Sequence, residues 1–304
     1  MKRFILKTFC FLLPIILAGV CMEVLLRNTP NDYLHKKEYL DKYSNEIETL
    51  ILGSSHSFYG INPIYFSSNA FNASHISQSL NYDFEIYKKY QDNFNNLKTI
   101  VIPISYFTLW GKLENGSEAW RVKNYSLYYE INTSGSTIDN TELFGNKLIV
   151  NIKRLYSYYV KSRGVSCSEL GWGTCYKSED SKDLVVSGKT AAKRHTRDDI
   201  YSEKNSNVLK ENIITLNSLI ESCKNIKIIF ITPPAYKTYI KNLNIEQKTK
   251  TIEIITDIAH RNNCEYLNLL EDASFVSNDF YDADHLNELG AKKLSILLKE
   301  KMNL

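Results

Sequence analysis

The sequence predicts an α/β protein in which a mainly parallel sheet is covered by helices in a three-layer α/β/α arrangement, with one transmembrane helix ahead of it. Three observations predict this fold class. A long apolar run follows a basic N-terminus, short apolar runs alternate with segments of helical spacing, and the 304 residues are enough for one large domain.

The N-terminal segment has the pattern of a membrane anchor. Residues 8–26 are nearly charge-free and close to the minimum of about 17–25 residues for a spanning helix. Because Lys2, Arg3 and Lys7 precede this run, we expect a cytoplasmic N-terminus and a domain on the outer, periplasmic or extracellular, side. Glu23 lies near the far end, where a carboxylate can reach the interface. No small-x-small cleavage site follows cleanly, which favours an uncleaved anchor.

The rest of the chain is expected to form one α/β domain. The anchor covers residues 1–27, a polar and charged stalk covers 28–46, and the domain covers 47–304. A stretch at about 111–204 is rich in Tyr, Ser, Asn and charge and has few buried-strand signals, so we interpret it as a long insertion. Such an insertion either shapes access to a site or is a solvated elaboration.

Five strands are predicted, at 48–52, 69–74, 99–104, 226–232 and 266–269. The third and fourth runs are almost continuously apolar, which is typical of parallel strands covered on both faces. Functional side chains are therefore expected at the carboxyl ends of the strands.

Between and after the strands, apolar residues recur at three- and four-residue spacing, which predicts helices. The predicted helices lie at 80–93, about 146–161, 205–223, 245–262 and 289–301, and a flexible loop is predicted at about 177–197.

Composition narrows the class of partner. The chain has 37 basic and 34 acidic residues, and the three basic residues before the anchor account for the whole excess. No basic patch of the kind that binds nucleic acid is visible, so no nucleic-acid partner is expected. No Cys/His spacing resembles a zinc site, and neither a metal nor a cofactor is expected.

Four of the six cysteines lie outside the anchor. Cys167 with Cys175, and Cys223 with Cys264, could form disulfides in an oxidising compartment, or all four could remain free thiols.

Two short segments carry the residues of a serine triad. Gly53-Ser54-Ser55 follows the first strand, and Asp282 precedes His285 by three residues just before the last helix. Serine needs a base to take its proton, and the base needs a third group to orient it. Spaced in this way, Asp282 and His285 can face the same side of one turn. We therefore expect Ser55 as nucleophile, His285 as base and Asp282 as its orienting acid.

Neighbouring residues leave alternatives open. Ser54 is an alternative nucleophile or a turn hydroxyl, and His56 either contacts substrate or packs beside the turn. Asp284 is an alternative to Asp282, but its position directly beside the histidine favours a solvated or capping role. His195 lies in a basic stretch and is expected to be solvated.

Three aromatic residues outside these segments, Tyr106, Trp110 and Trp120, either stack on sugar rings or pack in the core.

These motifs resemble the SGNH (GDSL-like) hydrolase superfamily, whose fold is flavodoxin-like. Ser55 matches the nucleophile of that family's first block, with Ser54 in place of its acid, and Asp282 and His285 match its Asp-x-x-His block. Residues 282–294 look like this block and the following helix of exported bacterial members, which act on cell-surface polysaccharides. There is also some likeness to the protein linked to D-alanylation of teichoic acids.

The middle blocks depart from the family pattern. Ser77 stands where the family has a glycine whose backbone N–H joins the oxyanion hole. The family's oxyanion asparagine is missing, and Ser105 is the residue expected to take its role. The resemblance therefore implies an oxyanion hole formed by Ser55, Ser77 and Ser105. One lost donor costs on the order of 10²–10³ in rate.

The resemblance implies a membrane-anchored, outward-facing acyltransferase or esterase. Its substrate would be an acyl group, most simply acetyl, on a cell-envelope polysaccharide, with a membrane-embedded protein delivering the acyl group. The alternative is a catalytically inactive relative that binds glycan or serves as a scaffold in envelope assembly.

Overall fold

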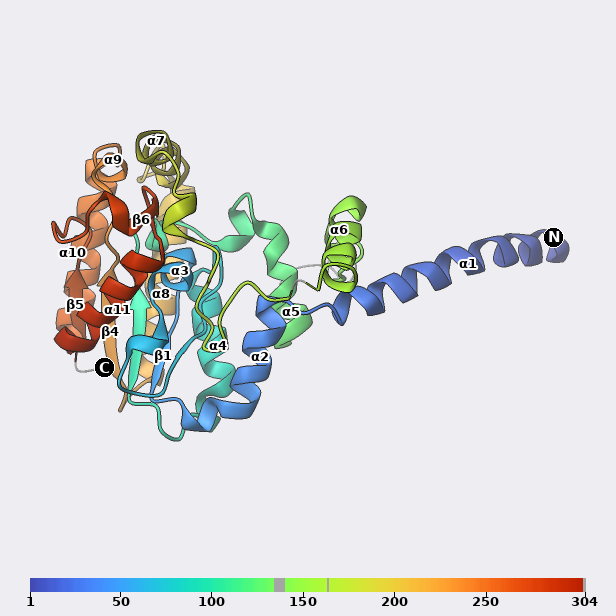
Figure 1. Cartoon of the computed structure of the whole chain (residues 1–304), viewed down its shortest axis with the longest axis horizontal. Coiled ribbons are helices and arrows are strands. Elements are labelled where there is room, and N and C mark those ends of the chain that lie inside the picture. Colours follow the sequence, from blue (N-terminus) through green and yellow to red (C-terminus); the bar gives the residue numbers. More distant parts are fainter. Residues whose placement is uncertain (134–139, 163, 303–304) are drawn as a thin grey trace. The chain divides into compact units, whose positions relative to one another are not determined.

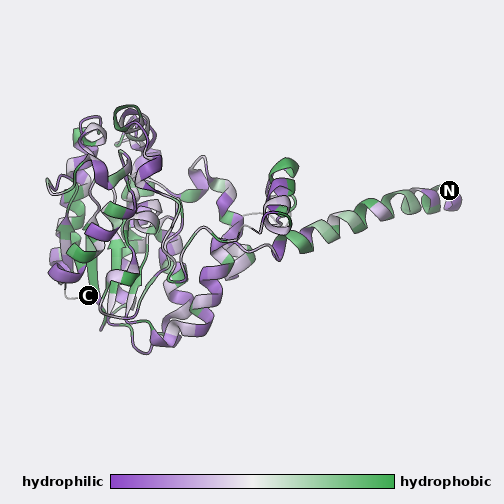
Figure 2. Ribbon diagram, viewed as in Figure 1, coloured by the Kyte–Doolittle hydropathy of each residue, from purple (hydrophilic) through white to green (hydrophobic). Residues whose placement is uncertain are grey.

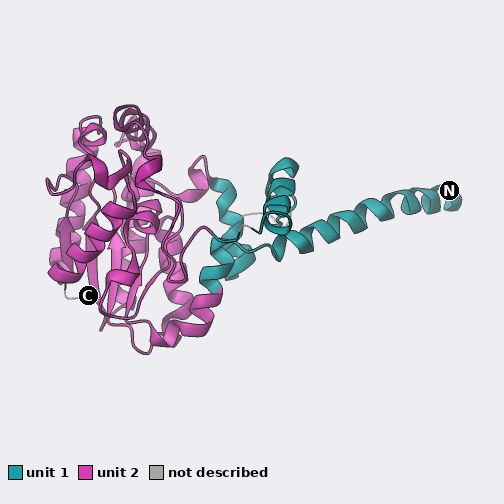
Figure 3. Ribbon diagram, viewed as in Figure 1, with its two compact units in different colours: residues 1–37, 119–165 teal, residues 38–118, 166–304 magenta. Residues whose placement is uncertain are grey.

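The computed structural model describes residues 1–133, 140–162 and 164–302. By its contacts the chain divides into two compact units (Figure 3). The helical unit comprises residues 1–37 and 119–165, and the sheet unit comprises residues 38–118 and 166–304. The predicted insertion is thus divided, because residues 166–204 cluster with the sheet and not with residues 119–165.

The sheet unit contains a five-stranded sheet in which all neighbouring strands are parallel, in the order β2-β1-β3-β4-β5 (Figure 1). Every strand lies within one of the predicted runs or overlaps it, so the predicted parallel sheet is confirmed. The strands are β1 (Thr49–Ile51), β2 (Ala70–Asn72), β3 (Thr99–Pro103), β4 (Lys227–Thr232) and β5 (Glu265–Asn268).

Helices connect and flank these strands, and the predicted helices of this unit are confirmed within a few residues. Side-chain caps define several starts; the Asn244 side chain, for example, accepts a hydrogen bond from the backbone N–H of Gln247. The helices are α3 (Ser55–Gly60), α4 (Leu80–Tyr90), α7 (Leu184–His195), α8 (Glu203–Ser222), α9 (Lys237–Ile240), α10 (Ile245–Arg261) and α11 (Glu288–Met302).

The apolar core lies against the sheet and explains why these segments pack. Val101 and Ile229 from the central strands meet Leu294 and Leu298 of α11, and all four side chains are fully buried. Burial of each such side chain contributes about 1.5–3 kcal/mol.

Helix α7 corrects the prediction of a flexible loop at 177–197. Asp183 caps it by accepting hydrogen bonds from the backbone N–H groups of Val185 and Val186. Gly188 obscured the helical pattern, but it allows α7 to pack closely on α9. A Cβ at Gly188 would lie 2.7 Å from Oγ1 of Thr238.

The predicted stalk is also helical. Helix α2 (Asp32–Tyr43) begins where the side chain of Asn31 accepts hydrogen bonds from two backbone N–H groups, and it buries Leu40. Its polar composition suggested a solvated segment, but its apolar residues have partners elsewhere in the chain.

The helical unit holds α1 (Lys2–Arg27), the start of α2, α5 (Val122–Tyr129) and α6 (Leu148–Tyr159). Among the described residues, α1 is the one helix long and apolar enough to span a membrane or to act as a signal anchor. Figure 2 shows its apolar residues along most of its length.

All six cysteines are free thiols in the part of the chain that the structure describes. Neither Cys167 with Cys175 nor Cys223 with Cys264 forms the disulfide that the sequence allowed.

Candidate functional site

A small hairpin fixes the acid and the histidine. Strands β6 (Phe280–Asp282) and β7 (His285–Leu286) are antiparallel, and Asp282 lies opposite His285. The Asp282 carboxylate accepts hydrogen bonds from the backbone N–H groups of Asp284 (3.1 Å) and His285 (2.9 Å). The two residues therefore meet across a tight turn of a hairpin, in a local geometry that their three-residue spacing permits.

The serine lies at the carboxyl end of β1, where the chain turns into α3. Gly53 has a φ of +106°, and a Cβ there would lie 2.6 Å from Oγ of Ser57, so this position requires glycine. The backbone N–H of Gly53 donates to Oδ1 of Asp83 at 2.7 Å, and Gln78 donates to the same oxygen at 2.6 Å. Burial raises the pKa of Asp83 to about 6.

Sequence reasoning missed Asp83. It lies 30 residues from the turn that it holds, in the first turn of α4. No local pattern distinguishes it from an ordinary acidic residue near a helix start.

The structure brings the three predicted triad residues together. Oγ of Ser55 lies 2.9 Å from Nε2 of His285, and Nδ1 of His285 lies 2.9 Å from Oδ1 of Asp282. The serine and the histidine are 230 residues apart in the sequence. Ser54, the alternative nucleophile, has no hydrogen bond to His285 among the described contacts.

A second carboxylate lies beside the histidine. Asp284 has only 2% of its side chain exposed, and its Oδ1 lies 3.5 Å from Nδ1 of His285. Its Oδ2 lies 3.6 Å from Nε2 of His56, 3.8 Å from Nδ1 of His195 and 3.5 Å from Nη2 of Arg194. The expected solvated or capping role of Asp284 is therefore wrong, because residues from α3 and α7 cover the hairpin turn.

These groups shift one another's pKa values. Burial opposes charge on His285, but Asp284 and Asp282 outweigh it and raise the pKa of His285 to about 10. Burial would raise the pKa of Asp284, but the charge of His285 and hydrogen bonds hold it well below its usual range. For His56 and His195 burial prevails and lowers the pKa. The cluster thus favours a negative Asp284, a protonated His285 and two neutral imidazoles.

His56 lies buried beside the nucleophile turn. Its Nδ1 is 2.6 Å from Oγ of Ser105, and its ring centroid is 4.9 Å from that of His285. The hydroxyl of Ser105 is therefore engaged by His56, and Ser105 is not among the residues that line the adjoining pocket. This geometry gives no support to Ser105 as an oxyanion donor.

The prediction that His195 is solvated is wrong. It ends α7 with 12% of its side chain exposed, and its Nδ1 lies 2.9 Å from the hydroxyl of Tyr239. Because the prediction assigned a loop to this segment, it could not anticipate that a helix carries His195 into the site.

Ser77 has the backbone conformation expected at a glycine position. Its φ is +60°, in the left-handed region that glycine adopts more readily than other residues. Its backbone N–H has no hydrogen-bond partner among the described residues, and its hydroxyl donates to the carboxylate of Glu118. Ser55 begins α3, so its N–H belongs to the group that a helix leaves unpaired. Neither N–H group has a hydrogen-bond partner among the described residues, and both residues line the adjoining pocket.

A pocket of about 540 Å³ adjoins the serine and the histidine. Its lining includes two of the three triad residues together with polar, aromatic and basic side chains. It includes Ser54, Ser55, Ser77, His285, Phe107, Tyr176, Glu118, Lys112, Arg194 and Arg197.

The three aromatic residues singled out in the sequence do not line this pocket. Tyr106 and Trp110 are buried and pack in the core, whereas Trp120 belongs to the helical unit and is 47% exposed.

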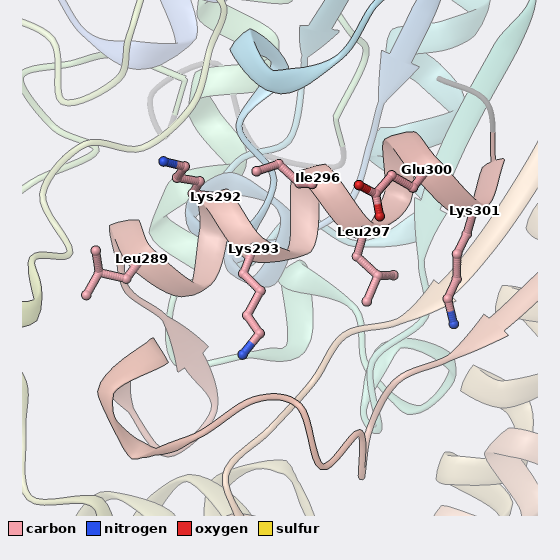
Figure 4. A pocket seen from close by; sticks show the side chains of 7 residues that line it. All are labelled: Leu289, Lys292, Lys293, Ile296, Leu297, Glu300 and Lys301. Carbon is pink, nitrogen blue, oxygen red and sulfur yellow. The ribbon is translucent and has the colours of Figure 1, made fainter.

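A second hollow, of about 490 Å³, lies along the surface of α11 (Figure 4). All its lining side chains come from this one helix, and none belongs to the triad. The chemistry-bearing residues are gathered at the first pocket.

Among the described residues, one group has the spacing of a metal site: the ligand atoms of His56, Asp284 and His285 lie within 4.8 Å of one another. Both ring nitrogens of His285 already have partners, Ser55 and Asp282. A metal would have to displace one of them, so the arrangement suits proton transfer better than metal binding.

The chain matches no protein-family model and no curated protein. The geometry of Ser55, His285 and Asp282 is therefore the basis for assigning a function.

Proposed function

We propose that this protein is a serine-dependent, SGNH-type acyltransferase or esterase. In this proposal it is anchored by α1 and faces outward, and it acts on acyl groups, most simply acetyl, of a cell-envelope polysaccharide. The observation that carries the proposal is the continuous hydrogen-bonded chain from Oγ of Ser55 through His285 to Asp282, with both links at 2.9 Å.

The fold supports the same class. The nucleophile follows the first strand of a parallel sheet, and the acid and histidine directly precede the last helix, as in the SGNH superfamily. Helices that pack on the sheet agree with a three-layer arrangement. The serine lies at the carboxyl end of its strand, where ligands bind in open α/β sheets.

The first half of the reaction would form an acyl-enzyme. Nε2 of His285 takes the proton of Ser55 as Oγ attacks the acyl carbonyl carbon. The oxyanion accepts hydrogen bonds from the backbone N–H groups of Ser55 and Ser77. His285 then gives its proton to the leaving oxygen, and the bond between acyl carbon and leaving group breaks.

The second half returns the serine. A glycan hydroxyl, for transfer, or water, for hydrolysis, loses its proton to His285 and attacks the acyl-enzyme. The bond to Oγ breaks, and Ser55 recovers the proton from His285. Asp282 keeps the imidazole in the required tautomer throughout.

The pocket composition suits a sugar. Phe107 lines the pocket as an aromatic side chain, and the polar and basic lining residues offer hydrogen bonds to hydroxyls. Tyr176 can contribute only its edge, because Tyr59 and Tyr281 stack on its ring at centroid distances of 3.6 Å and 3.8 Å. A membrane-embedded protein that delivers the acyl group would be consistent with the apolar helix α1, which would keep donor and enzyme in one membrane.

Labelling with a serine-reactive fluorophosphonate tests the proposal. We expect the wild type and the matched control Ser54→Ala to be labelled and Ser55→Ala to lose the label. The control lies one residue away in the same turn, so it separates loss of the nucleophile from disturbance of the turn. Equal labelling of Ser55→Ala would remove this serine from the mechanism.

One observation favours the alternative of a non-catalytic glycan-binding or scaffold protein. The Glu118 carboxylate accepts a hydrogen bond from Ser77, and negative charge there opposes an oxyanion. This alternative predicts an unlabelled wild type that still binds envelope glycan, with binding that is unaffected by Ser55→Ala.

A further inference from the structure

Helix α6 presents an apolar face to the outside of the molecule. Leu148, Ile152 and Tyr156 follow one another at four-residue spacing, and Ile149 and Tyr159 lie on the same face. All five are exposed, with about half or more of each residue accessible. Phe144, just before the helix, is 70% exposed.

The opposite face of α6 is anchored, so the apolar face is held outward. Asn151 is fully buried, and its Nδ2 donates to the backbone carbonyls of Glu142 and Leu143, at 3.0 Å each. Arg154 donates to the Glu142 carboxylate at 2.6 Å and 3.2 Å. Rotation of the helix to hide its apolar face would break these bonds.

The start of this segment is fastened to the apolar helix α1. The Glu23 carboxylate accepts hydrogen bonds from the backbone N–H groups of Glu142 (3.1 Å) and Leu143 (2.7 Å). The Leu143 side chain lies against Gly19, where an added Cβ would be 3.6 Å away. These contacts lie in the last turns of α1, close to its C-terminal end.

We propose that α6 lies in the membrane interface with its apolar face among the lipid acyl chains. If α1 crosses the bilayer, any segment that is fixed to the end of α1 lies at the membrane surface. Figure 1 shows α6 running across the direction of α1 and not along it. An α1 along the membrane normal therefore holds α6 close to the membrane plane.

The charge pattern of α6 identifies the occupant as lipid. Lys153 lies beside the apolar face, Lys147 and Lys161 lie just before and just after the helix, and residues 143–161 contain no acidic residue. Basic residues beside an apolar face with interfacial tyrosines are typical of helices that lie on anionic membranes. This proposal concerns the helical unit alone and does not depend on the chemistry of Ser55.

Lipid-quenching measurements on the full chain test the proposal. The six native cysteines are replaced by alanine, and one cysteine is introduced by Ile152→Cys and labelled with the environment-sensitive dye NBD. The protein is reconstituted in phosphatidylcholine vesicles containing phosphatidylglycerol, with and without doxyl-labelled lipid. Ser157→Cys, on the polar side of the same helix, is the matched control.

We expect the dye at position 152 to have blue-shifted emission and several-fold stronger quenching by doxyl lipid than the dye at position 157. Weak quenching at both positions would mean that α6 lies in water and would overturn the proposal. Blue-shifted emission at 152 without lipid quenching would also overturn it, because the face would then be covered by protein. Ile149→Cys repeats the test at a second position, and circular dichroism verifies the fold of each variant.

Discussion

Glu142 in the helical unit and Asp284 in the sheet unit are both buried carboxylates, and their charges are neutralised in different ways. In the helical unit, Glu142 meets Lys123 at 2.7 Å and Arg154 at 2.6 Å. In the sheet unit, Asp284 is surrounded mainly by imidazoles, of which His285 is a member of the triad. Lysine and arginine serve here as fixed countercharges, whereas an imidazole can give up and take back a proton during a reaction.

The difference separates a structural ion cluster from one suited to chemistry. Burial opposes charge on Glu142, but hydrogen bonds and charge from Arg154 and Lys123 outweigh it and lower the pKa of Glu142 to about 2. Glu142 therefore keeps its charge over most of the pH range. The Asp284 cluster contains a histidine whose proton can leave and return, which is what acid–base catalysis requires.

The largest expected effect is on catalysis. Asp282→Asn keeps the size of the side chain but favours the wrong tautomer of His285. We expect the labelling rate of Ser55 to fall about 10³–10⁴-fold. The measurement is the rate of fluorophosphonate labelling at fixed pH. Asp272→Asn, at an exposed turn carboxylate that accepts from Ser274, is the control and should change nothing. If the labelling rate of Asp282→Asn falls by less than tenfold, the carboxylate does not orient the histidine.

The next effect is on stability. Glu142→Gln leaves Lys123 and Arg154 without a buried countercharge, and we expect a loss of about 3–5 kcal/mol in the free energy of unfolding. Denaturant unfolding in detergent micelles, followed by circular dichroism, measures it. Asp257→Asn, which breaks an exposed pair with Arg261, is the control and should have little effect. Protein that remains folded should label at Ser55 at the wild-type rate.

A similar loss in the control and in Glu142→Gln would mean that burial of the Glu142 cluster contributes nothing special. The Glu142 cluster would then not be a structural ion cluster of the kind that the comparison between the two units assumes.

A smaller effect is expected in the pH dependence. The raised pKa of His285 keeps it protonated at neutral pH, so the labelling rate should rise with pH towards about 10. Asp284→Asn removes one of the two charges that raise this pKa. We expect the whole profile to move to lower pH by about one unit, which corresponds to about 1.4 kcal/mol. An unchanged profile would mean that Asp284 does not act on His285.

The pKa shifts of His285 and Glu142 also make the stability of the fold depend on pH, and the dependence has opposite signs in the two units. The pKa of His285 is higher in the folded state than in the unfolded state, so its contribution is present at low pH and is lost as pH rises through about 10. The pKa of Glu142 is lower in the folded state, so its contribution is present at neutral pH and is lost as pH falls through about 2.

How far the sequence predicts the molecule depends on where the information lies. The strands were predictable because buried parallel strands are continuous apolar runs, as in β3 and β4. Ser55, Asp282 and His285 were predictable because each lies in a short segment of recognisable spacing. Helix α7 was not, since Gly188 serves close packing on α9 and so weakens the local helical pattern.

The surroundings of the triad could not be read from one sequence. Asp284 meets His56 and His195, and Asp83 meets Gly53, only after distant segments pack together. Asp284 is buried because other elements cover the hairpin, and the sequence around Asp284 contains no pattern that indicates this burial. Ser77 shows an intermediate case: the expected match to a glycine position stays a prediction, and the structure shows that its backbone has the left-handed conformation that glycine adopts most readily.

The smallest expected effect compares a left-handed serine in each unit. Ser77 has φ +60° and Ser162 has φ +52°, a conformation that costs a non-glycine residue about 1–2 kcal/mol. We expect Ser77→Gly and Ser162→Gly each to stabilise the protein by up to about 1 kcal/mol, because glycine adopts this conformation freely but loses more entropy on folding. Only Ser77→Gly removes the hydroxyl that donates to Glu118 beside the proposed oxyanion position, so only this variant should also raise the labelling rate of Ser55. Denaturant midpoints and labelling rates of the two variants measure both effects. Equal labelling rates in the two variants would show that Glu118 does not oppose the oxyanion, whereas a fall specific to Ser77→Gly would mean that the serine hydroxyl itself assists the reaction.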